Sequence, residues 1–223
     1  MKQEEQNRIL TQALRVLTEK CPRLRKMCYW AGTSAIALEV LHHRQSFDLD
    51  FHTYRALTDV RPVLAEIQKT FPGRFELLSA PDEFGSGFKG IFILSDKAKV
   101  TVEVLSNFQD VEQSELTDSK IAPGMKRITP RRYLADKIQC ITEKSEARDL
   151  VDMNALLQKF PELASVAKEI IAGQDALILI ERLLSWSDQT IQDDLLVYTD
   201  VDPRDAMEAR DFLLEWLKKG KDR

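Results

Sequence analysis

The chain has 223 residues, a formal net charge of −4, 43% hydrophobic residues and 30% charged residues. This composition predicts a folded protein with enough apolar material for one large domain or two small ones, and it excludes a disordered polar chain. The net negative charge argues against binding of nucleic acid over the whole surface, so any such surface must be local.

The cysteines and the N-terminal residues indicate the cellular compartment in which the protein is expected. The three cysteines, Cys21, Cys28 and Cys140, are an odd number without CxxC spacing, which argues against a zinc site or a disulfide framework. The first ten residues, MKQEEQNRIL, carry charges where a signal peptide needs an apolar core. No apolar run approaches the roughly 20 residues that cross a bilayer. We therefore expect a cytoplasmic protein that makes no contact with a membrane.

Apolar periodicity predicts the elements of the first half in chain order. Residues 3–20 predict an amphipathic helix that Pro22 stops, and residues 34–43 predict a second helix after a glycine turn. Residues 47–52 alternate between apolar and polar, which is the period of a strand. Another helix is predicted over 60–71. Three strands are then expected, at 74–79, 88–94 and 99–105.

The second half of the chain predicts helices. After Asn107 the chain is polar as far as Pro123-Gly124, and the later segments all have helical patterns: 130–144, 147–158, 161–172, 174–187 and 203–219. Strands followed by helices indicate an α+β protein. We expect a mixed-sheet domain over residues 1–125 and a helical domain over residues 126–223.

Two acidic residues lie inside the apolar strand predicted at 47–52. Residues two apart in a strand point to the same face, about 6.5–7 Å from each other, so Asp48 and Asp50 project together. Charges in an apolar setting are costly unless they are paired or hold a metal, and two carboxylates suit Mg²⁺ or Mn²⁺. Alternatively, the pair lies on a solvated strand face.

Glu103 is a candidate third carboxylate. It stands alone among β-branched residues in KVTVEVL, and an adjacent strand would bring it near the acidic pair. Three carboxylates around two metal ions suit phosphoryl or nucleotidyl transfer. The alternative is an alternating strand that simply exposes a glutamate.

Gly32-Thr33-Ser34 forms a candidate phosphate-binding turn. A glycine turn before a helix can present backbone N–H groups to a phosphate, and the hydroxyl groups of Thr33 and Ser34 could add hydrogen bonds. Alternatively, Ser34 is the N-cap of the helix. Because one short helix separates Gly32 from Asp48, we expect the turn and the acidic pair to face each other.

At this point the sequence resembles the nucleotidyltransferase superfamily related to DNA polymerase β. More closely, it resembles the AbiEii/AbiGii family, the nucleotidyltransferase toxins of type IV toxin–antitoxin systems. Family members typically read LAGGTALAL…HRRSxDLDF, and this chain reads WAGTSAIALEVLHHRQSFDLDF from Trp30 to Phe51. A helix with a central ADK is matched at Ala135-Asp136-Lys137, and the family's ARDLxDL is matched by ARDLVDM from Ala147 to Met153.

The resemblance implies a nucleotidyltransferase-like fold and a metal-dependent reaction. A nucleoside monophosphate would pass from an NTP to an acceptor, which is tRNA for characterised toxins of this kind, and a cognate antitoxin is a further expected partner. By motif match, Asp48 and Asp50 would hold the metal and Lys137 would contact the triphosphate. Arg148, Asp149 and Asp152 fall on the later motif and would take part in nucleotide binding, the alternative being a surface salt-bridge face.

A basic cluster precedes and includes the ADK motif. Its members are Lys120, Lys126, Arg127, Arg131, Arg132 and Lys137. The cluster predicts either a local track for RNA or triphosphate, or a solubilising linker between domains.

The sequence thus predicts a metal-dependent nucleotidyltransferase. One alternative is a binding protein for a nucleotide or a partner on the same fold, with transfer impaired because Thr33 replaces the family's second glycine. Another is an enzyme of the same class that acts on a protein or a small molecule.

Overall fold

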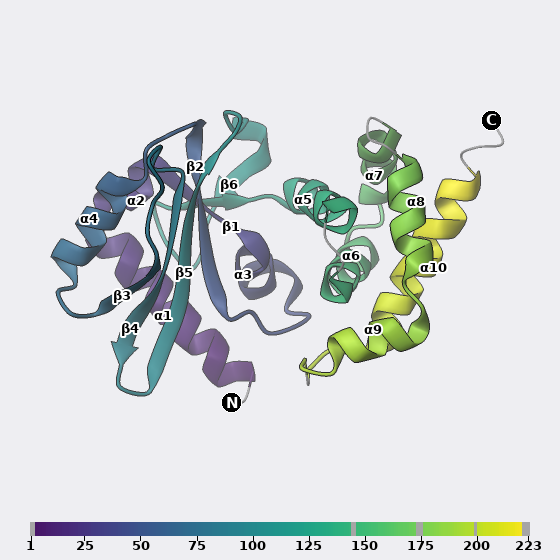
Figure 1. Cartoon of the computed structure of the whole chain (residues 1–223), viewed down its shortest axis with the longest axis horizontal. Coiled ribbons are helices and arrows are strands. Elements are labelled where there is room, and N and C mark those ends of the chain that lie inside the picture. The colour runs from purple at the N-terminus through teal and green to yellow at the C-terminus, as the bar shows by residue number, and fades with distance from the viewer. Residues whose placement is uncertain (1–2, 144–145, 173–175, 199, 220–223) are drawn as a thin grey trace. The chain divides into compact units, whose positions relative to one another are not determined.

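The computed structural model describes residues 3–143, 146–172, 176–198 and 200–219. The chain divides into two compact units, Met1–Thr129 and Pro130–Arg223 (Figure 1). The boundary predicted from the sequence is at 125/126, and each unit is described by itself.

The first unit is built on a seven-stranded sheet with the order β3-β4-β5-β2-β1-β7-β6. β2 is central, parallel to β5 and antiparallel to β1, and β1 is parallel to β7. The sheet is therefore mixed, as expected for the α+β class. The strands are β1 (Cys28–Ala31), β2 (Asp48–Ala56), β3 (Phe75–Ser79), β4 (Gly87–Ser95), β5 (Ala98–Asn107), β6 (Leu116–Asp118) and β7 (Lys126–Ile128).

Alternation along the central strands separates a buried face from a more open one. In β2, Leu49 and Phe51 are fully buried, whereas Asp48 and Asp50 are partly exposed on the other face. The buried positions of β4 and β5 are apolar in the same way. Helix α1 (Gln3–Lys20) contacts β2, β4 and β5, and α2 (Pro22–Met27) contacts β1, β2 and α4 (Arg61–Thr70). The sequence did not predict α2, which begins at the proline expected only to stop the preceding helix.

The helix predicted at 34–43 has a different form. Helix α3 (Gly32–Ile36) passes into a π-helical segment, η1 (Ala37–Leu41), which ends at His42 in the left-handed conformation with φ 56°. A π-helical turn rotates the following side chains relative to an α-helix and is frequent at functional sites. It ends the helical segment shortly before β2.

The polar stretch after Asn107 is not a simple linker. It contains a short 3₁₀ turn, η2 (Gln113–Glu115), and the antiparallel strands β6 and β7. Trp30 of β1 is the residue opposite Arg127 of β7, so this hairpin extends the sheet. Single-sequence periodicity misses strands of three residues because they span little more than one alternation.

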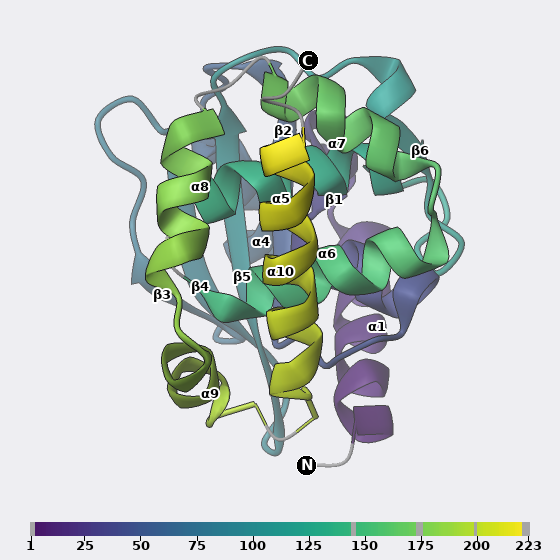
Figure 2. The ribbon, with the colours of Figure 1, turned by 90° about the vertical axis from the view of Figure 1, so that its right-hand side faces the viewer.

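The second unit is helical, as predicted. Helix α10 (Pro203–Lys219) crosses α6 (Ala147–Lys159) and also contacts α8 (Ala176–Ser185) and α9 (Asp188–Leu195) (Figure 2). The sequence missed α9, which Ser187 caps by accepting a hydrogen bond from the backbone N–H of Thr190. The predicted helix end at 144 and helix start at 174 lie outside the described residues. The helices are α5 (Pro130–Glu143), α6 (Ala147–Lys159), α7 (Leu163–Ala172), α8 (Ala176–Ser185), α9 (Asp188–Leu195) and α10 (Pro203–Lys219).

Among the helices that the structure describes, none combines the length and apolar character needed to cross a membrane.

Candidate functional site

Asp48 and Asp50 stand at the beginning of the central strand β2. Both are partly exposed on one face, while Leu49 between them is buried on the other. The Ser46 hydroxyl donates a hydrogen bond to Asp48 Oδ1 over 3.1 Å. The strand period thus places two carboxylates side by side on the open face of the sheet.

Glu103 lies directly opposite Asp50 on the parallel strand β5. Because residues opposite each other in a ladder share a face, Glu103 projects on the same side as the acidic pair, which is the arrangement that the sequence predicted. The next strand brings Lys89 opposite Glu103, and Lys89 Nζ lies 3.5 Å from Glu103 Oε2. This lysine was not predicted from the sequence as part of the site.

The ion pair with Lys89 bears on the expected three-carboxylate cluster. Among the described residues, no three acidic, histidine or cysteine side chains converge closely enough to hold a metal ion. Two carboxylates, from Asp48 and Asp50, share the strand face, and the third is engaged by an ammonium group.

The glycine turn adjoins the acidic pair directly. Gly32 has φ 67°, a conformation that favours glycine, and a Cβ at this position would overlap the carboxylate of Asp50. Gly32 is therefore required both for the backbone conformation and for the close approach of Asp50. The structure brings the turn and the acidic pair together, as the sequence predicted.

The two hydroxyl residues of the turn differ in their surroundings. Ser34 is fully buried, and its Oγ accepts a hydrogen bond from the Trp30 indole over 3.0 Å. It is not the N-cap of the helix, because α3 begins at Gly32 after an extended Ala31. Thr33 is partly exposed, and its Oγ1 accepts a hydrogen bond from the guanidinium of Arg44 over 3.2 Å.

Arg44 is a residue of this site that was not predicted from the sequence. It is buried, it contacts the turn through Thr33, and its Nη1 donates to the carbonyl oxygen of Gln45 over 3.0 Å. The available signal was its place in HHRQSFDLDF, inside the segment that carries the family resemblance. A buried guanidinium beside a glycine turn can attract an anionic group.

A second cluster lies within the helical unit. The ammonium group of Lys137 on α5 is 2.7 Å from Asp149 Oδ1 and 2.9 Å from Asp152 Oδ2, both on α6, and all three residues are buried. The Lys137 ammonium also lies 5.2 Å from the centre of the Tyr133 ring. Asp149 and Asp152 share a helix face, as their spacing predicted.

The ionisation of Lys137 and that of its carboxylate partners depend on one another. Burial alone would lower the pKa of the Lys137 ammonium, but Asp152 and Asp149 hold that pKa well above its ordinary value. Burial raises the pKa of the Asp149 carboxyl, and Lys137 opposes that rise. With one ammonium and two carboxylates, the cluster satisfies the charge of Lys137 inside its own unit, which the sequence did not reveal.

Arg148 belongs to a different contact. It pairs with Glu146 at 2.7 Å, donates to the Tyr198 hydroxyl over 3.1 Å and lies 5.9 Å from the centre of that ring. Of the ARDLVDM motif, the structure therefore joins Asp149 and Asp152 to Lys137, while Arg148 contacts the segment after α9.

Most of the predicted basic cluster is paired with carboxylates. Lys126 pairs with Asp118, Arg131 with Glu169 and Arg132 with Asp136, at 2.9, 3.8 and 2.7 Å. Its residues are also divided between the two units at Thr129. This neutralisation weakens the interpretation of the cluster as one continuous track for RNA.

Arg127 of the basic cluster is buried against Glu39 of η1. Its Nε donates to Glu39 Oε2 over 2.8 Å. The same carboxylate accepts hydrogen bonds from the Ser119 hydroxyl and from the backbone N–H groups of Lys120 and Ile121. The π-helical turn thus anchors the loop before β7.

A family profile decides the identity of the chain. The profile of the nucleotidyl transferase AbiEii toxin, type IV toxin–antitoxin system, matches residues 15–215. The chain belongs to the AbiEii family. Comparison with curated protein sequences found no significant match.

Solved structures of nucleotidyltransferases are similar in fold to this AbiEii protein. A candidate nucleotidyltransferase from Helicobacter pylori is 17% identical with a TM-score of 0.58, covering 94% of this chain and 95% of its own. JHP933 from Helicobacter pylori is 19% identical with a TM-score of 0.56 and coverages of 96% and 95%. MenT4, a nucleotidyltransferase toxin from Mycobacterium tuberculosis, is 16% identical with a TM-score of 0.52 and coverages of 84% and 65%. At these identities the likeness shows the fold.

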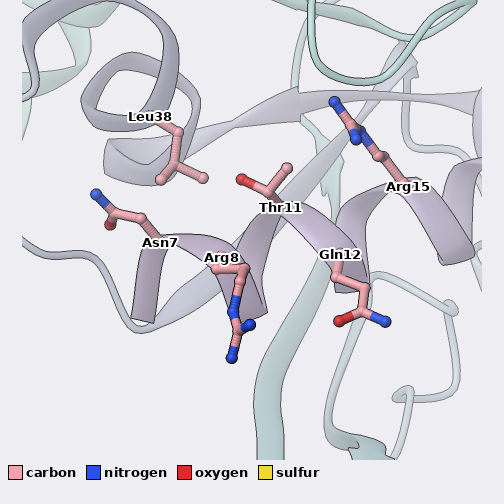
Figure 3. A pocket seen from close by; sticks show the side chains of 6 residues that line it. All are labelled: Asn7, Arg8, Thr11, Gln12, Arg15 and Leu38. Atoms are coloured by element: carbon pink, nitrogen blue, oxygen red, sulfur yellow. The ribbon is translucent and has the colours of Figure 1, made fainter. Parts of the chain in front are cut away.

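A surface hollow of about 410 Å³ lies on the AbiEii sheet unit between α1 and η1. Figure 3 shows Asn7 and Thr11 of α1 extending toward Leu38, with Arg8 and Gln12 extending away from it. The hollow contains none of the predicted site residues. It is lined by Asn7, Arg8, Thr11, Gln12, Arg15 and Leu38.

Proposed function

We propose that this AbiEii protein is a metal-dependent nucleotidyltransferase. The acceptor hydroxyl would attack the α-phosphorus of an NTP, the bond from that phosphorus to the pyrophosphate oxygen would break, and the hydroxyl proton would leave to a base. The observation that carries the proposal is the contact of Gly32 with Asp50, which sets the candidate phosphate-binding turn against the acidic pair.

The carboxylates of Asp48 and Asp50 fit a divalent cation with a preference for oxygen, Mg²⁺ or Mn²⁺. They are partly exposed and lie on one strand face, and phosphate oxygens and water would complete the coordination. When bound, the cation would supply charge stabilisation for the transferred phosphoryl group. Glu103 would add a third carboxylate after release from Lys89, which makes this lysine a residue that tunes the site.

The turn and the buried charges would bind the nucleotide. Gly32 and Thr33 present backbone N–H groups at the beginning of α3, and Arg44 holds a cationic group beside Thr33. Ser34 supports the turn through Trp30.

We propose that Lys137, Arg148, Asp149 and Asp152 take part in nucleotide binding. Binding of a phosphate oxygen at Lys137 would require one carboxylate partner to move aside, because both now lie within 2.9 Å of its ammonium group.

For the acceptor we propose RNA, with tRNA expected from the family resemblance. The hollow between α1 and η1 supports this choice, since guanidinium and amide groups there suit a sugar–phosphate backbone. The type IV toxin–antitoxin family implies an NTP substrate and an antitoxin partner. We propose a cytoplasmic location, where NTPs and tRNA are available.

The test combines transfer with metal binding. The protein is incubated with each labelled NTP, Mg²⁺ or Mn²⁺, and total RNA. Asp48→Asn and Asp50→Asn should each abolish labelling and weaken Mn²⁺ binding in calorimetry, while the fold is retained. Asp118→Asn, which changes an exposed carboxylate of β6, is the matched control and should change neither. Full labelling by the double Asp48/Asp50 variant would reject the metal assignment.

The acceptor is tested by charge reversal in the hollow. Arg8→Glu with Arg15→Glu should weaken RNA binding more than NTP binding, and the affinity for RNA should fall with salt. The RNA affinity of this variant is compared with that of Lys120→Glu with Lys126→Glu, which reverses charge in the predicted basic cluster. Label that appears only on protein, with all four NTPs, would overturn RNA as the acceptor and leave the transfer reaction standing.

A catalytically impaired binding protein is the second candidate. The engagement of Glu103 by Lys89 and the threonine at position 33 favour it. Calorimetric binding of an NTP without transfer to RNA, protein or small molecules would select this alternative.

A further inference from the structure

Three large apolar side chains are strongly exposed at one end of the sheet. Leu57, Phe84 and Phe108 are 78%, 75% and 90% exposed. We call these three residues the apolar tip. Single exposed apolar residues are common on folded proteins, but a group of them, aromatic ones above all, is typical of a contact surface.

The segments that carry the apolar tip are joined by backbone hydrogen bonds. The N–H of Leu57 donates to the carbonyl of Asn107 over 2.8 Å, next to Phe108. The N–H of Ser106 donates to the carbonyl of Ser86 over 2.7 Å, and Val60 donates to Gly85, which follows Phe84. Three segments distant in sequence therefore lie side by side at this end of the sheet.

The loop that carries Phe84 is held in a fixed conformation. Asp82 Oδ1 accepts hydrogen bonds from the N–H groups of Phe84 and Ser86, over 3.1 and 2.8 Å, and Asp82 Oδ2 accepts one from the Ser86 hydroxyl over 2.6 Å. Gly85 has φ 70°, and a Cβ there would overlap the carboxylate of Asp59. An apolar side chain displayed on a pre-ordered loop loses little conformational entropy when a partner binds.

Leu57 is held in an unusual conformation for its type. Its φ is 49°, the left-handed region that favours glycine, and its side chain points into solvent. Strained residues of this kind cluster at functional surfaces, because an exposed position with no role would accept glycine or asparagine more readily.

The charged residues around the apolar tip indicate which kind of partner would bind there. The flanking segments carry four carboxylates, Asp59, Asp82, Glu83 and Asp110, against the two guanidinium groups of Arg55 and Arg61. Arg61 pairs with Asp59, and Arg55 with Asp110. The rim is therefore acidic, which disfavours RNA and would set like charges together in a symmetric contact between two copies of the chain.

The apolar tip and the acidic pair lie at different ends of β2. β2 begins at Asp48 and ends at Ala56, next to Leu57, so the tip lies at the opposite end of the central strand from the proposed site of transfer. We propose that the apolar tip is a docking surface for a basic segment of a partner protein that carries apolar side chains on one face.

The test uses the full chain and two synthetic helical peptides with the same apolar face, one with lysines and one with glutamates on the polar face. In fluorescence anisotropy the lysine peptide should bind and the glutamate peptide should not, and binding should weaken with salt. Phe84→Ser with Phe108→Ser should reduce affinity by at least about tenfold, the effect of removing aromatic hot spots.

Leu196→Ser with Val197→Ser is the matched control. These residues are 75% and 78% exposed and belong to the helical unit, so their loss should leave the affinity unchanged. Failure of the lysine peptide to bind, equal binding of both peptides, or an equal loss in the control variant would overturn the proposal. A dimer in sedimentation that Phe84→Ser with Phe108→Ser dissociates would do the same, since it would assign the tip to a second copy.

Discussion

Replacement of Gly32 by alanine tests whether the turn and the acidic pair work as one site. Gly32 has φ 67°, and an added Cβ would overlap the Asp50 carboxylate. The chain offers Gly73 as a matched control, because it has φ 70° and no neighbouring atom within 4 Å of an added Cβ. Both substitutions force an alanine into the left-handed region, and only Gly32→Ala displaces Asp50.

The expected magnitudes separate the two effects. The left-handed conformation costs about 1–2 kcal/mol for a residue with a Cβ, which is the loss of unfolding free energy expected for Gly73→Ala. Overlap in a packed site adds about 1–3 kcal/mol, so Gly32→Ala should lose about 2–5 kcal/mol in total. Urea unfolding followed by circular dichroism measures both values.

Metal binding and NTP-dependent labelling of the two glycine variants provide a second measurement. Gly32→Ala should also weaken Mn²⁺ binding and abolish NTP-dependent labelling, because the displaced Asp50 carboxylate no longer lies beside Asp48. Gly73→Ala should retain both. Equal destabilisation of the two variants, or unchanged Mn²⁺ affinity in Gly32→Ala, would refute the reasoning.

Three further substitutions test buried and paired charges. Hydrogen bonds overcome the effect of burial and keep the pKa of Glu39 below its ordinary value, so stability from this group is present above the unfolded pKa and lost as pH falls through the folded pKa. Glu39→Gln should leave Arg127 buried without its counter-charge and lower the free energy of unfolding by about 3 kcal/mol at pH 7. It should also make the free energy of unfolding depend less on pH in the acid range. Lys137→Met should lower the free energy of unfolding by about 3–5 kcal/mol at pH 7, because it leaves two buried carboxylates without their counter-charge. The loss should be smaller at low pH, where carboxylates are protonated. A loss that does not change with pH in urea titrations would contradict the charge cluster. Lys89→Met should change stability by less than about 1 kcal/mol, since the pair is partly exposed, but should strengthen Mn²⁺ binding by releasing Glu103; weaker binding in calorimetry would reject that role.

Local patterns in the sequence were sufficient for the main architecture and for part of the site. The alternation over residues 47–52 placed Asp48 and Asp50 on one strand face, and the spacing of Asp149 and Asp152 placed them on one helix face. Such periods depend only on backbone geometry within a single element. The ordered motifs also indicated the AbiEii family, which the family profile confirms.

Short and irregular elements escaped prediction. The strands β6 and β7 have three residues each, and the π-helical turn η1 is a single five-residue segment whose apolar pattern does not distinguish it from an α-helix. These elements depend on neighbours: β7 is ordered by pairing with β1, and η1 by the contacts of Glu39 with the loop before β7. Their sequences carry too few periods to signal them.

The sequence by itself determined which residues share a face, but only the tertiary structure decided which charges meet. Lys89 reaches Glu103 because of the register between β4 and β5, and Asp50 packs on Gly32 because β2 lies beside β1. Lys137 is neutralised because α5 and α6 pack with their charged groups inward. Strand register and helix packing are selected by burial of the whole apolar core, so the partners of a charged side chain are not encoded in its own segment.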